Sequence, residues 1–195
     1  MQFVEPIRDP KRIARIKTLL KGQERYRDLL LFVMGINTAL RISDLLRVTS
    51  NDLFTDVGKI RSRFWVKERK RGKRREVVIN HSIREAIDLY LIAYPEITND
   101  PQHFVFFNFK AAPYSTPIKR GQAWKIITTI CHEAGLQGHF GTHSLRKTWG
   151  YHARKQGVDL SLIMHQLNHA KLAYTKRYLG ITDDELGAVV RRLNL

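Results

Sequence analysis

Several features common in secreted and membrane proteins are scarce in this sequence. Cys131 is its single cysteine, so no disulfide can form within the chain, which fits a reducing compartment. The N-terminal stretch M-Q-F-V-E-P-I-R-D-P has no apolar signal core. The longest apolar run, Leu29–Ile36, is far too short to span a bilayer. We therefore expect a cytoplasmic protein without a membrane partner.

Acidic residues are also scarce relative to basic ones. The 195 residues include 34 Lys and Arg against 18 Asp and Glu, which gives a net charge of +16. Such an excess usually indicates a polyanionic partner, most often nucleic acid. The alternative is a solvated basic surface or ribosome-like packing. Length and a hydrophobic content of 43% predict one globular domain with a substantial core.

The spacing of apolar residues predicts helices near the N-terminus. A helix capped by Asp9 is expected over residues 10–22, and a second helix with a wide apolar face is expected from about residue 24 through 33. Ser43 is expected to cap a third helix. Arg41 would then lie at a junction between two helices.

A basic β-hairpin is expected after these helices. Residues Gly58–Val66 and Glu76–Ile79 are rich in β-branched and aromatic side chains, and Gly72 supplies the turn. The intervening segment K-E-R-K-R-G-K-R-R, which begins at Lys67, is strongly basic. This hairpin would present several cations to a partner.

The remaining chain is predicted to be mainly helical. Ser82 and Glu85 are placed as a capping box for a helix that ends before Pro95, and a helix after Thr116-Pro117 should run to about Ala134. The expected caps of the later helices are Thr142, Asp159 and the Thr182–Glu185 box. The apolar run 104–107 leaves its type open. The predicted fold class is mostly α with a small antiparallel β-sheet (α+β).

A chemically distinctive segment begins at His143. His143 and Arg146 stand three residues apart on an expected helix and so share a face, and His169 and Tyr178 follow. A guanidinium can hold the non-bridging oxygens of a phosphate, an imidazole can move a proton, and a phenol can attack phosphorus. Together these groups suit a phosphate centre.

Spacing restricts how this segment can fold. Nine residues of unbroken helix would turn His169 and Tyr178 to opposite faces, so a shared site requires a bend, which we expect at residues 170–173. Tyr174 lies one turn before Tyr178 on the same face. The spacing alone therefore leaves both phenols open as the nucleophile.

A metal site is the alternative use of these histidines. His165 and His169 are four residues apart, as in a zinc-binding helix, but Gln-Leu-Asn between them lacks the glutamate of that motif. No carboxylate cluster accompanies the pair in the sequence. We expect neither a metal nor another cofactor.

Five motifs occur in a fixed order along the chain. They are A-L-R-I-S-D around Arg41, K-R-G-K from Lys70, H-S-L-R from His143, L-N-H ending at His169, and K-R-Y-L containing Tyr178. With this set the chain resembles the tyrosine recombinases, the phage-integrase family, over nearly its whole length. The resemblance implies the family's catalytic fold. In that family the nucleophilic tyrosine lies nine positions after the last histidine. The resemblance therefore also implies that Tyr178, nine positions after His169, is the nucleophile.

The resemblance further implies a site-specific recombinase that exchanges DNA strands without metal or ATP. Tyr178 would attack a phosphodiester of double-stranded DNA, form a 3′-phosphotyrosyl link and free a 5′-hydroxyl. Arg41 and Arg146 would hold the non-bridging oxygens, and Lys70 would protonate the leaving oxygen. The implied catalytic set is Arg41, Lys70, His143, Arg146, His169 and Tyr178.

The two histidines and the other cations complete this expectation. His143 would assist proton transfer to or from the tyrosine, and His169 would hydrogen-bond the phosphate. Further DNA contacts are expected from basic residues near the motifs. These residues are Arg71, Lys73, Arg74, Lys119, Arg120 and Lys147.

Two departures from the family pattern stand out. Asn168 occupies a position where the family commonly has glycine, and about 37 residues precede the Arg41 motif, too few for the helical DNA-clamping domain of most members. We expect residues 1–195 to form a single catalytic domain, either excised from a longer protein or belonging to a small recombinase. The rival functions are type IB topoisomerase-like nicking and closing, and non-catalytic DNA binding.

The segment after Tyr178 also carries an expectation. Residues 181–195 have apolar side chains at helical spacing, and that face needs a groove to bury it. Relatives dock such a tail on the neighbouring subunit. We therefore expect a free monomer and a tetramer on paired DNA sites, with packing of the tail on its own domain as the alternative.

Overall fold

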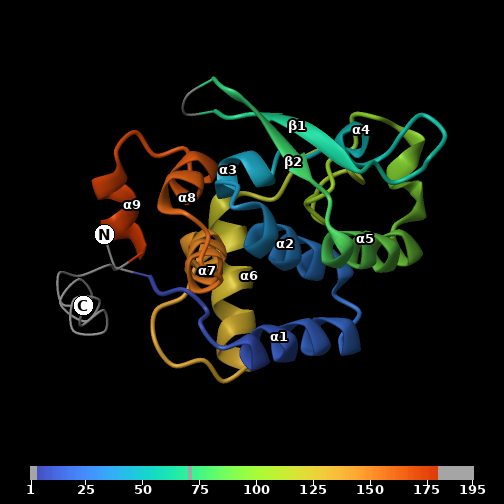
Figure 1. The fold of residues 1–195 in the computed structure, drawn as a ribbon. Helices are drawn as coiled ribbons and strands as arrows, with labels where there is room; N and C mark the ends of the chain where they lie inside the picture. The colour runs from blue at the N-terminus through green and yellow to red at the C-terminus, as the bar shows by residue number, and fades with distance from the viewer. Residues whose placement is uncertain (1–3, 70–71, 180–195) are drawn as a thin grey trace, which may run out of the picture.

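A computed structural model describes residues 4–69 and 72–179, without the side chain of Arg177, and contains a helical body with one β-hairpin above it (Figure 1). The predicted fold class is confirmed. The elements in order are α1 (Pro10–Gly22), α2 (Tyr26–Thr38), α3 (Ile42–Leu45), α4 (Ser50–Leu53), β1 (Arg63–Lys67), β2 (Arg74–Val78), α5 (His81–Ala93), the 3-10 helix η1 (Pro95–Asn99), α6 (Arg120–Glu133), α7 (Thr142–Lys155), α8 (Leu160–Gln166) and α9 (Leu172–Leu179).

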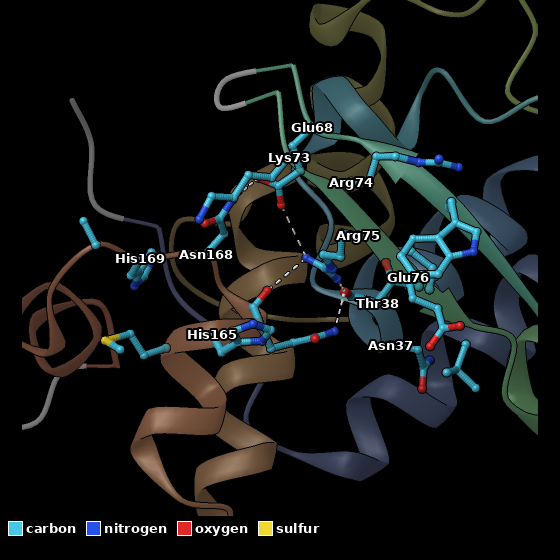
Figure 2. Close-up of a pocket in the computed structure, with 16 residues that line it drawn as sticks. Asn37, Thr38, Glu68, Lys73, Arg74, Arg75, Glu76, His165, Asn168 and His169 are labelled. Atoms are coloured by element: carbon cyan, nitrogen blue, oxygen red, sulfur yellow. Dashed lines mark hydrogen bonds and ion pairs between the residues drawn. The ribbon is translucent and has the colours of Figure 1, made fainter.

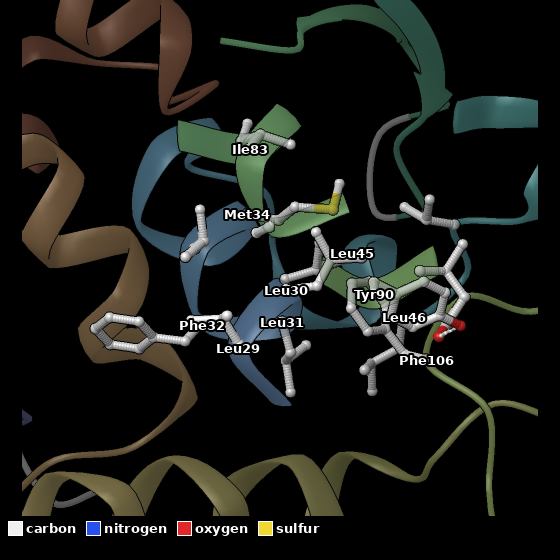
Figure 3. Packing of buried hydrophobic residues seen from close by; sticks show 14 of the residues in the cluster. Leu29, Leu30, Leu31, Phe32, Met34, Leu45, Leu46, Ile83, Tyr90 and Phe106 are labelled. Carbon is white, nitrogen blue, oxygen red and sulfur yellow. Dashed lines mark hydrogen bonds between the residues drawn. The ribbon is translucent and has the colours of Figure 1, made fainter. Parts of the chain in front are cut away.

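Helix α2 is the centre of the core, as its wide apolar face predicts. Its residues from Leu29 to Met34 are all buried, and α1, α5 and α7 pack around it (Figures 1 and 3). A helix that is apolar on all sides requires neighbours on all sides. Tyr90 of α5 is fully buried nearby, and its hydroxyl donates to the carbonyl of Val105 at 2.8 Å.

Gly35 allows α2 and α7 to approach closely. A Cβ added at Gly35 would lie 2.5 Å from Cδ1 of Leu145, a buried side chain of α7. The neighbour of Leu145 in the chain is Arg146, so this contact also sets the position of a candidate catalytic residue. The close approach therefore connects core packing to the site.

The predicted hairpin is confirmed, although its first strand begins at Arg63 rather than Gly58 and its second begins at Arg74 rather than Glu76. Strands β1 and β2 are antiparallel, and Trp65 pairs with Glu76 in the register. Phe64 and Val77 are buried against the body, while Trp65 is exposed on the other face, as the alternation of side chains along a strand requires. Gly72 lies in the turn with a φ of 66°, in the left-handed region that glycine tolerates.

Asp9 and Asp159 cap α1 and α8 as predicted, but the cap predicted for the third helix is wrong. Arg41 itself is the N-cap of α3, and Ser43 lies inside the helix. The preceding turn explains the difference. Ala39 ends α2 in the left-handed region with a φ of 53°, so the chain re-enters helix two residues earlier than the Ser43 prediction assumed.

Two further caps are also shifted toward the N-terminus. Asn80, rather than the Ser82 and Glu85 box, caps α5, because its side chain accepts the N–H of Ile83. Gly141, rather than Thr142, is the N-cap of α7. The apolar run 104–107 forms isolated bridges to Thr49 and Pro117 and belongs to no named strand. Within the described part of the chain, no helix is long and apolar enough to cross a membrane.

Candidate active site

A cleft of about 360 Å³ collects the described members of the predicted catalytic set. Their elements are separate in sequence: the start of α3, the first two turns of α7, the α8–α9 link, and α9. Lys70 lies outside the described residues, so its position is not part of this geometry. The predicted residues that line the cleft are Arg41, His143, Arg146, His169 and Tyr178.

The chain turns between α8 and α9, as the spacing of His169 and Tyr178 predicts. The turn begins earlier than predicted, because α8 ends at Gln166 and Asn168 adopts a left-handed φ of 46°. His169 Nδ1 lies 3.0 Å from the hydroxyl of Thr175 on α9. The rings of His169 and Tyr178 meet edge to face, with centroids 5.2 Å apart. The turn therefore places imidazole and phenol side by side.

Arg146 connects α7 to the C-terminal ends of α2 and α8. Its side chain is 4% exposed, and Nη1 donates to the carbonyl of Ala39 at 2.8 Å. Nη2 donates to the carbonyl of Leu167. Burial lowers the pKa of Arg146, although the group stays cationic near neutral pH. Two of its five N–H donors are used in this way, so the others remain available for an anion.

Arg41 is held by an acid that sequence reasoning did not single out. Its Nη1 lies 2.6 Å from Oε2 of Glu68, a side chain that is 1% exposed. Asn168 donates to the same oxygen, and Arg75 lies 3.8 Å from Oε1. Glu68 is the one acidic residue in the basic stretch from Lys67 to Arg75, and that isolation is the signal that could have identified it.

A second buried acid ties the hairpin to α3. Asp44, which is 3% exposed, accepts the backbone N–H of Arg69 at 3.1 Å. Asp44 belongs to the A-L-R-I-S-D motif, but sequence reasoning assigned no role to it. Its contact fixes the end of the hairpin next to the Arg41 junction.

His143 is open to solvent at the cleft, and its pKa is lowered. The protein packed on part of its ring disfavours the charged form, and the nearby cations Arg146, Arg120, Lys147 and Arg41 lower the pKa further. Both effects favour the neutral imidazole near pH 7. A neutral imidazole can accept a proton.

Tyr178 presents a protonated phenol to the cleft. Burial raises its pKa to about 12, while the charge of Arg146 acts in the opposite direction. The phenolic oxygen is buried, and no group in residues 4–69 and 72–179 bonds to it with good hydrogen-bond geometry, although the Arg146 side chain lies near enough to favour the ionised phenol. Tyr174, the rival, also lines the cleft, but its side chain is 57% exposed. An activating base is therefore needed for attack by Tyr178.

The described members of the predicted DNA contacts lie in three regions: the hairpin, the start of α6, and α7. Lys73 and Arg74 are exposed on the hairpin beside a larger cleft of about 880 Å³ (Figure 2), and Arg71 lies outside the described residues. Lys119 and Arg120 are exposed at the start of α6. Lys147 is different, because it is 7% exposed and its Nζ lies 5.4 Å from the ring centroid of Tyr178.

The histidine pair considered for a metal is divided by the turn. His165 lies on α8, whereas His169 follows the helix end at Gln166. Among the described residues, no group of three or more His, Cys, Asp or Glu side chains is arranged to hold a metal ion. Although the two histidines are four residues apart, they therefore do not share one face of a helix.

Known proteins match this chain over most of its length. The family model described as "Phage integrase family" matches residues 9–185. The "Probable integrase/recombinase YoeC" of Bacillus subtilis is 34% identical over 191 residues, which cover 98% of this chain and 97% of that protein. The "Tyrosine recombinase XerD" of Corynebacterium glutamicum is 27% identical over 85% of this chain.

The chain spans nearly all of the first relative but 52% of the second. The fold is also similar to a solved structure, the XerH site-specific recombinase bound to a palindromic difH substrate in a post-cleavage complex. The TM-score is 0.72 at 18% identity, with 100% of this chain and 54% of the XerH chain covered. At this identity the likeness establishes the fold.

Proposed function

The chain belongs to the phage integrase family, and from that membership we propose that it is a site-specific recombinase that cuts and rejoins double-stranded DNA. One observation carries the proposal. Arg41, His143, Arg146, His169 and Tyr178, from four separate segments, line one cleft. Chance surface placement would not gather a phenol, two imidazoles and two guanidiniums in this way.

The cleavage step is a transfer of phosphorus from one oxygen to another. The phenolic oxygen of Tyr178 forms a bond to phosphorus, and the bond from phosphorus to the 5′-oxygen breaks. His143, neutral near pH 7, accepts the phenolic proton. The products are a 3′-phosphotyrosyl link and a DNA strand with a free 5′-hydroxyl.

The other residues stabilise charge and supply a proton. Arg41 and Arg146 hold the non-bridging oxygens with the N–H donors that their protein contacts leave available. His169 donates a hydrogen bond to the phosphate. The role of Lys70, protonation of the leaving 5′-oxygen, rests on the family resemblance.

Rejoining requires no external energy source. The phosphotyrosyl link keeps the energy of the phosphodiester, so a 5′-hydroxyl from a partner strand can attack it in the reverse of the first step. We therefore propose a reaction independent of ATP and metal. EDTA should leave it unchanged.

The proposed partner is double-stranded DNA. The net charge of +16 and the exposed cations beside the clefts suit a polyanion. The XerH recombinase, whose fold is similar, is solved with its palindromic difH substrate bound. We propose a free monomer that assembles as a tetramer on paired sites. The tail expected to link subunits, residues 181–195, lies outside the described residues.

The test combines adduct formation with strand exchange. A site recovered from random double-stranded DNA by binding selection is nicked near its centre, so that cleavage releases a short fragment and traps the intermediate. The expected results are a covalent adduct resistant to SDS and recombinant products from a plasmid with two sites. Binding without adduct would contradict the proposal. Relaxation of a supercoiled single-site plasmid without any two-site recombination would instead indicate a nicking-closing enzyme.

A further inference from the structure

Glu68 is an isolated acid in the most basic part of the chain. It follows the end of β1, is 1% exposed, and lies among three donors: Arg41, Arg75 and Asn168. Figure 2 shows Glu68, Arg75 and Asn168 converging between the hairpin and the α8–α9 link. A buried carboxylate needs such partners, because removal from water disfavours its charge.

The surroundings of Glu68 keep it ionised. Burial raises the pKa of the carboxyl, but the hydrogen bonds from Asn168 and Arg41 and the charges of Arg41 and Arg75 outweigh it, so the pKa is lowered. Oε2 receives both hydrogen bonds, whereas Oε1 receives none from the described residues. Glu68 is therefore a fixed negative charge aimed chiefly at Arg41.

Glu68 lies behind Arg41 rather than in front of it. Arg41 lines the candidate active-site cleft, but Glu68 is not among the residues lining that cleft and borders the larger neighbouring one. Glu68 uses one N–H of Nη1, which leaves the other donors of Arg41 for a phosphate. This arrangement orients the guanidinium without occupying the phosphate position.

Asn168 connects Glu68 to the turn that carries His169. Its backbone has a φ of 46°, and its side-chain amide donates to Oε2 of Glu68. A glycine, which the family commonly has here, would suit the same backbone but would lack the donor. In this chain, one carboxylate thus contacts both the arginine at the start of α3 and the turn before α9.

We propose that Glu68 is a positioning residue for DNA cleavage: its carboxylate fixes Arg41 toward the scissile phosphate and, through Asn168, holds the His169 turn in register with it. This inference rests on the proposed recombinase function. Glu68 acts through Arg41 and does not touch the DNA. Its removal should therefore impair the chemical step more than the binding of DNA.

The experiment measures the single-turnover rate of adduct formation at saturating nicked DNA, together with the Kd for that DNA and the Tm. Glu68→Gln keeps the shape but loses the charge, and we expect the rate to fall about 10- to 100-fold. The Kd should change by less than about threefold, well under one tenfold step of affinity. Glu76→Gln is the matched control, because Glu76 is on the same hairpin and pairs with Arg63 at the surface. Its rate should equal that of the unaltered protein.

Two variants of Asn168 complete the design. Asn168→Gly removes the donor at a backbone position that glycine tolerates, and its rate should fall about 3- to 10-fold with the Kd unchanged. The exchange Glu68→Gln with Asn168→Asp keeps one carboxylate and one amide beside Arg41. This exchange should recover at least about one tenfold step of the rate lost in Glu68→Gln. A residue needed for folding alone would show no such recovery at equal Tm.

The outcomes separate this inference from the proposed function. Absence of adduct with the unaltered protein would refute the recombinase function itself. If the unaltered protein cleaves and Glu68→Gln cleaves as fast as Glu76→Gln, the function stands and the role of Glu68 is refuted. A faster Glu68→Gln would make Glu68 a competitor of the phosphate, which also overturns the inference. Should Glu68→Gln fail to fold, Asn168→Gly decides: an unreduced rate refutes the inference.

Discussion

Arg146→Lys tests whether one guanidinium both assembles the site and binds the phosphate. Arg146 donates to the carbonyls of Ala39 and Leu167, the residues that cap the C-terminal ends of α2 and α8. A lysine keeps the charge, but its single ammonium can reach one of these carbonyls. The variant therefore loses one charge-assisted hydrogen bond and leaves one buried acceptor unsatisfied, a cost of about 1–3 kcal/mol.

This cost corresponds to a measurable change in Tm. For a chain of this size, 1 kcal/mol shifts Tm by about 2–4 °C, so we expect a fall of about 2–12 °C by calorimetry. Arg15→Lys, at an exposed position on α1, is the control and should leave the stability within about 0.5 kcal/mol.

The same substitution should reduce cleavage beyond its effect on stability. A lysine cannot present the planar fork that holds two oxygens of a phosphate, and loss of one such stabilising donor costs about 10²–10³ in rate. Adduct formation on the nicked site should fall by this factor at a temperature where the variant is fully folded. A variant with unchanged Tm and unchanged adduct rate would refute both roles given to Arg146.

Three further predictions concern protons and packing. The pKa of His143 lies below its usual 6.5, so the rate of adduct formation should not change with pH above about pH 7. On acidification through that lowered pKa the rate should fall, by up to about tenfold per pH unit. A rate that still rises above about pH 8 would contradict His143 as the proton acceptor. Lys70→Ala should slow cleavage of ordinary DNA but not of a substrate with a 5′-bridging sulfur, which leaves without a proton; slow cleavage of both would remove that role. Gly35→Ala should lower the free energy of unfolding by about 1–3 kcal/mol in denaturant titrations, because its added Cβ meets Leu145. Gly121→Ala is the control and should not lower it, since beyond its own helix and chain neighbours no described atom lies within 4 Å of the added Cβ. Equal stabilities of the two variants would contradict the close approach of α2 and α7.

Local patterns in the sequence predict the elements but not where each helix begins. The hairpin and most helices follow from alternation, helical spacing and turn residues. The cap of α5 was misplaced because Asn80 and Ser82 are both good caps, and the choice depends on where β2 delivers the chain. Likewise, the left-handed Ala39 makes Arg41 the cap of α3. These choices depend on tertiary entry points, which a local pattern does not contain.

The sequence predicted the residues proposed to act on the phosphate, but it did not predict the residues that hold them in place. The five described catalytic candidates follow from the family motifs, and the turn before α9 follows from the spacing of His169 and Tyr178. The contact between Glu68 and Asn168 joins residues 100 positions apart, and no local pattern signals such a pair. The choice between Tyr174 and Tyr178 likewise required the family pattern, because both lie on one helical face.

The most direct test is to identify which tyrosine becomes linked to DNA. Trypsin cuts after Lys171, Lys176, Arg177 and Arg191, so Tyr174 falls in the peptide 172–176 and Tyr178 in the peptide 178–191. The trapped adduct is digested with trypsin and nuclease, and the peptide bearing the nucleotide remnant is identified by mass spectrometry. We predict the remnant on Tyr178 in the peptide 178–191. A remnant on Tyr174 in the peptide 172–176 would contradict the account.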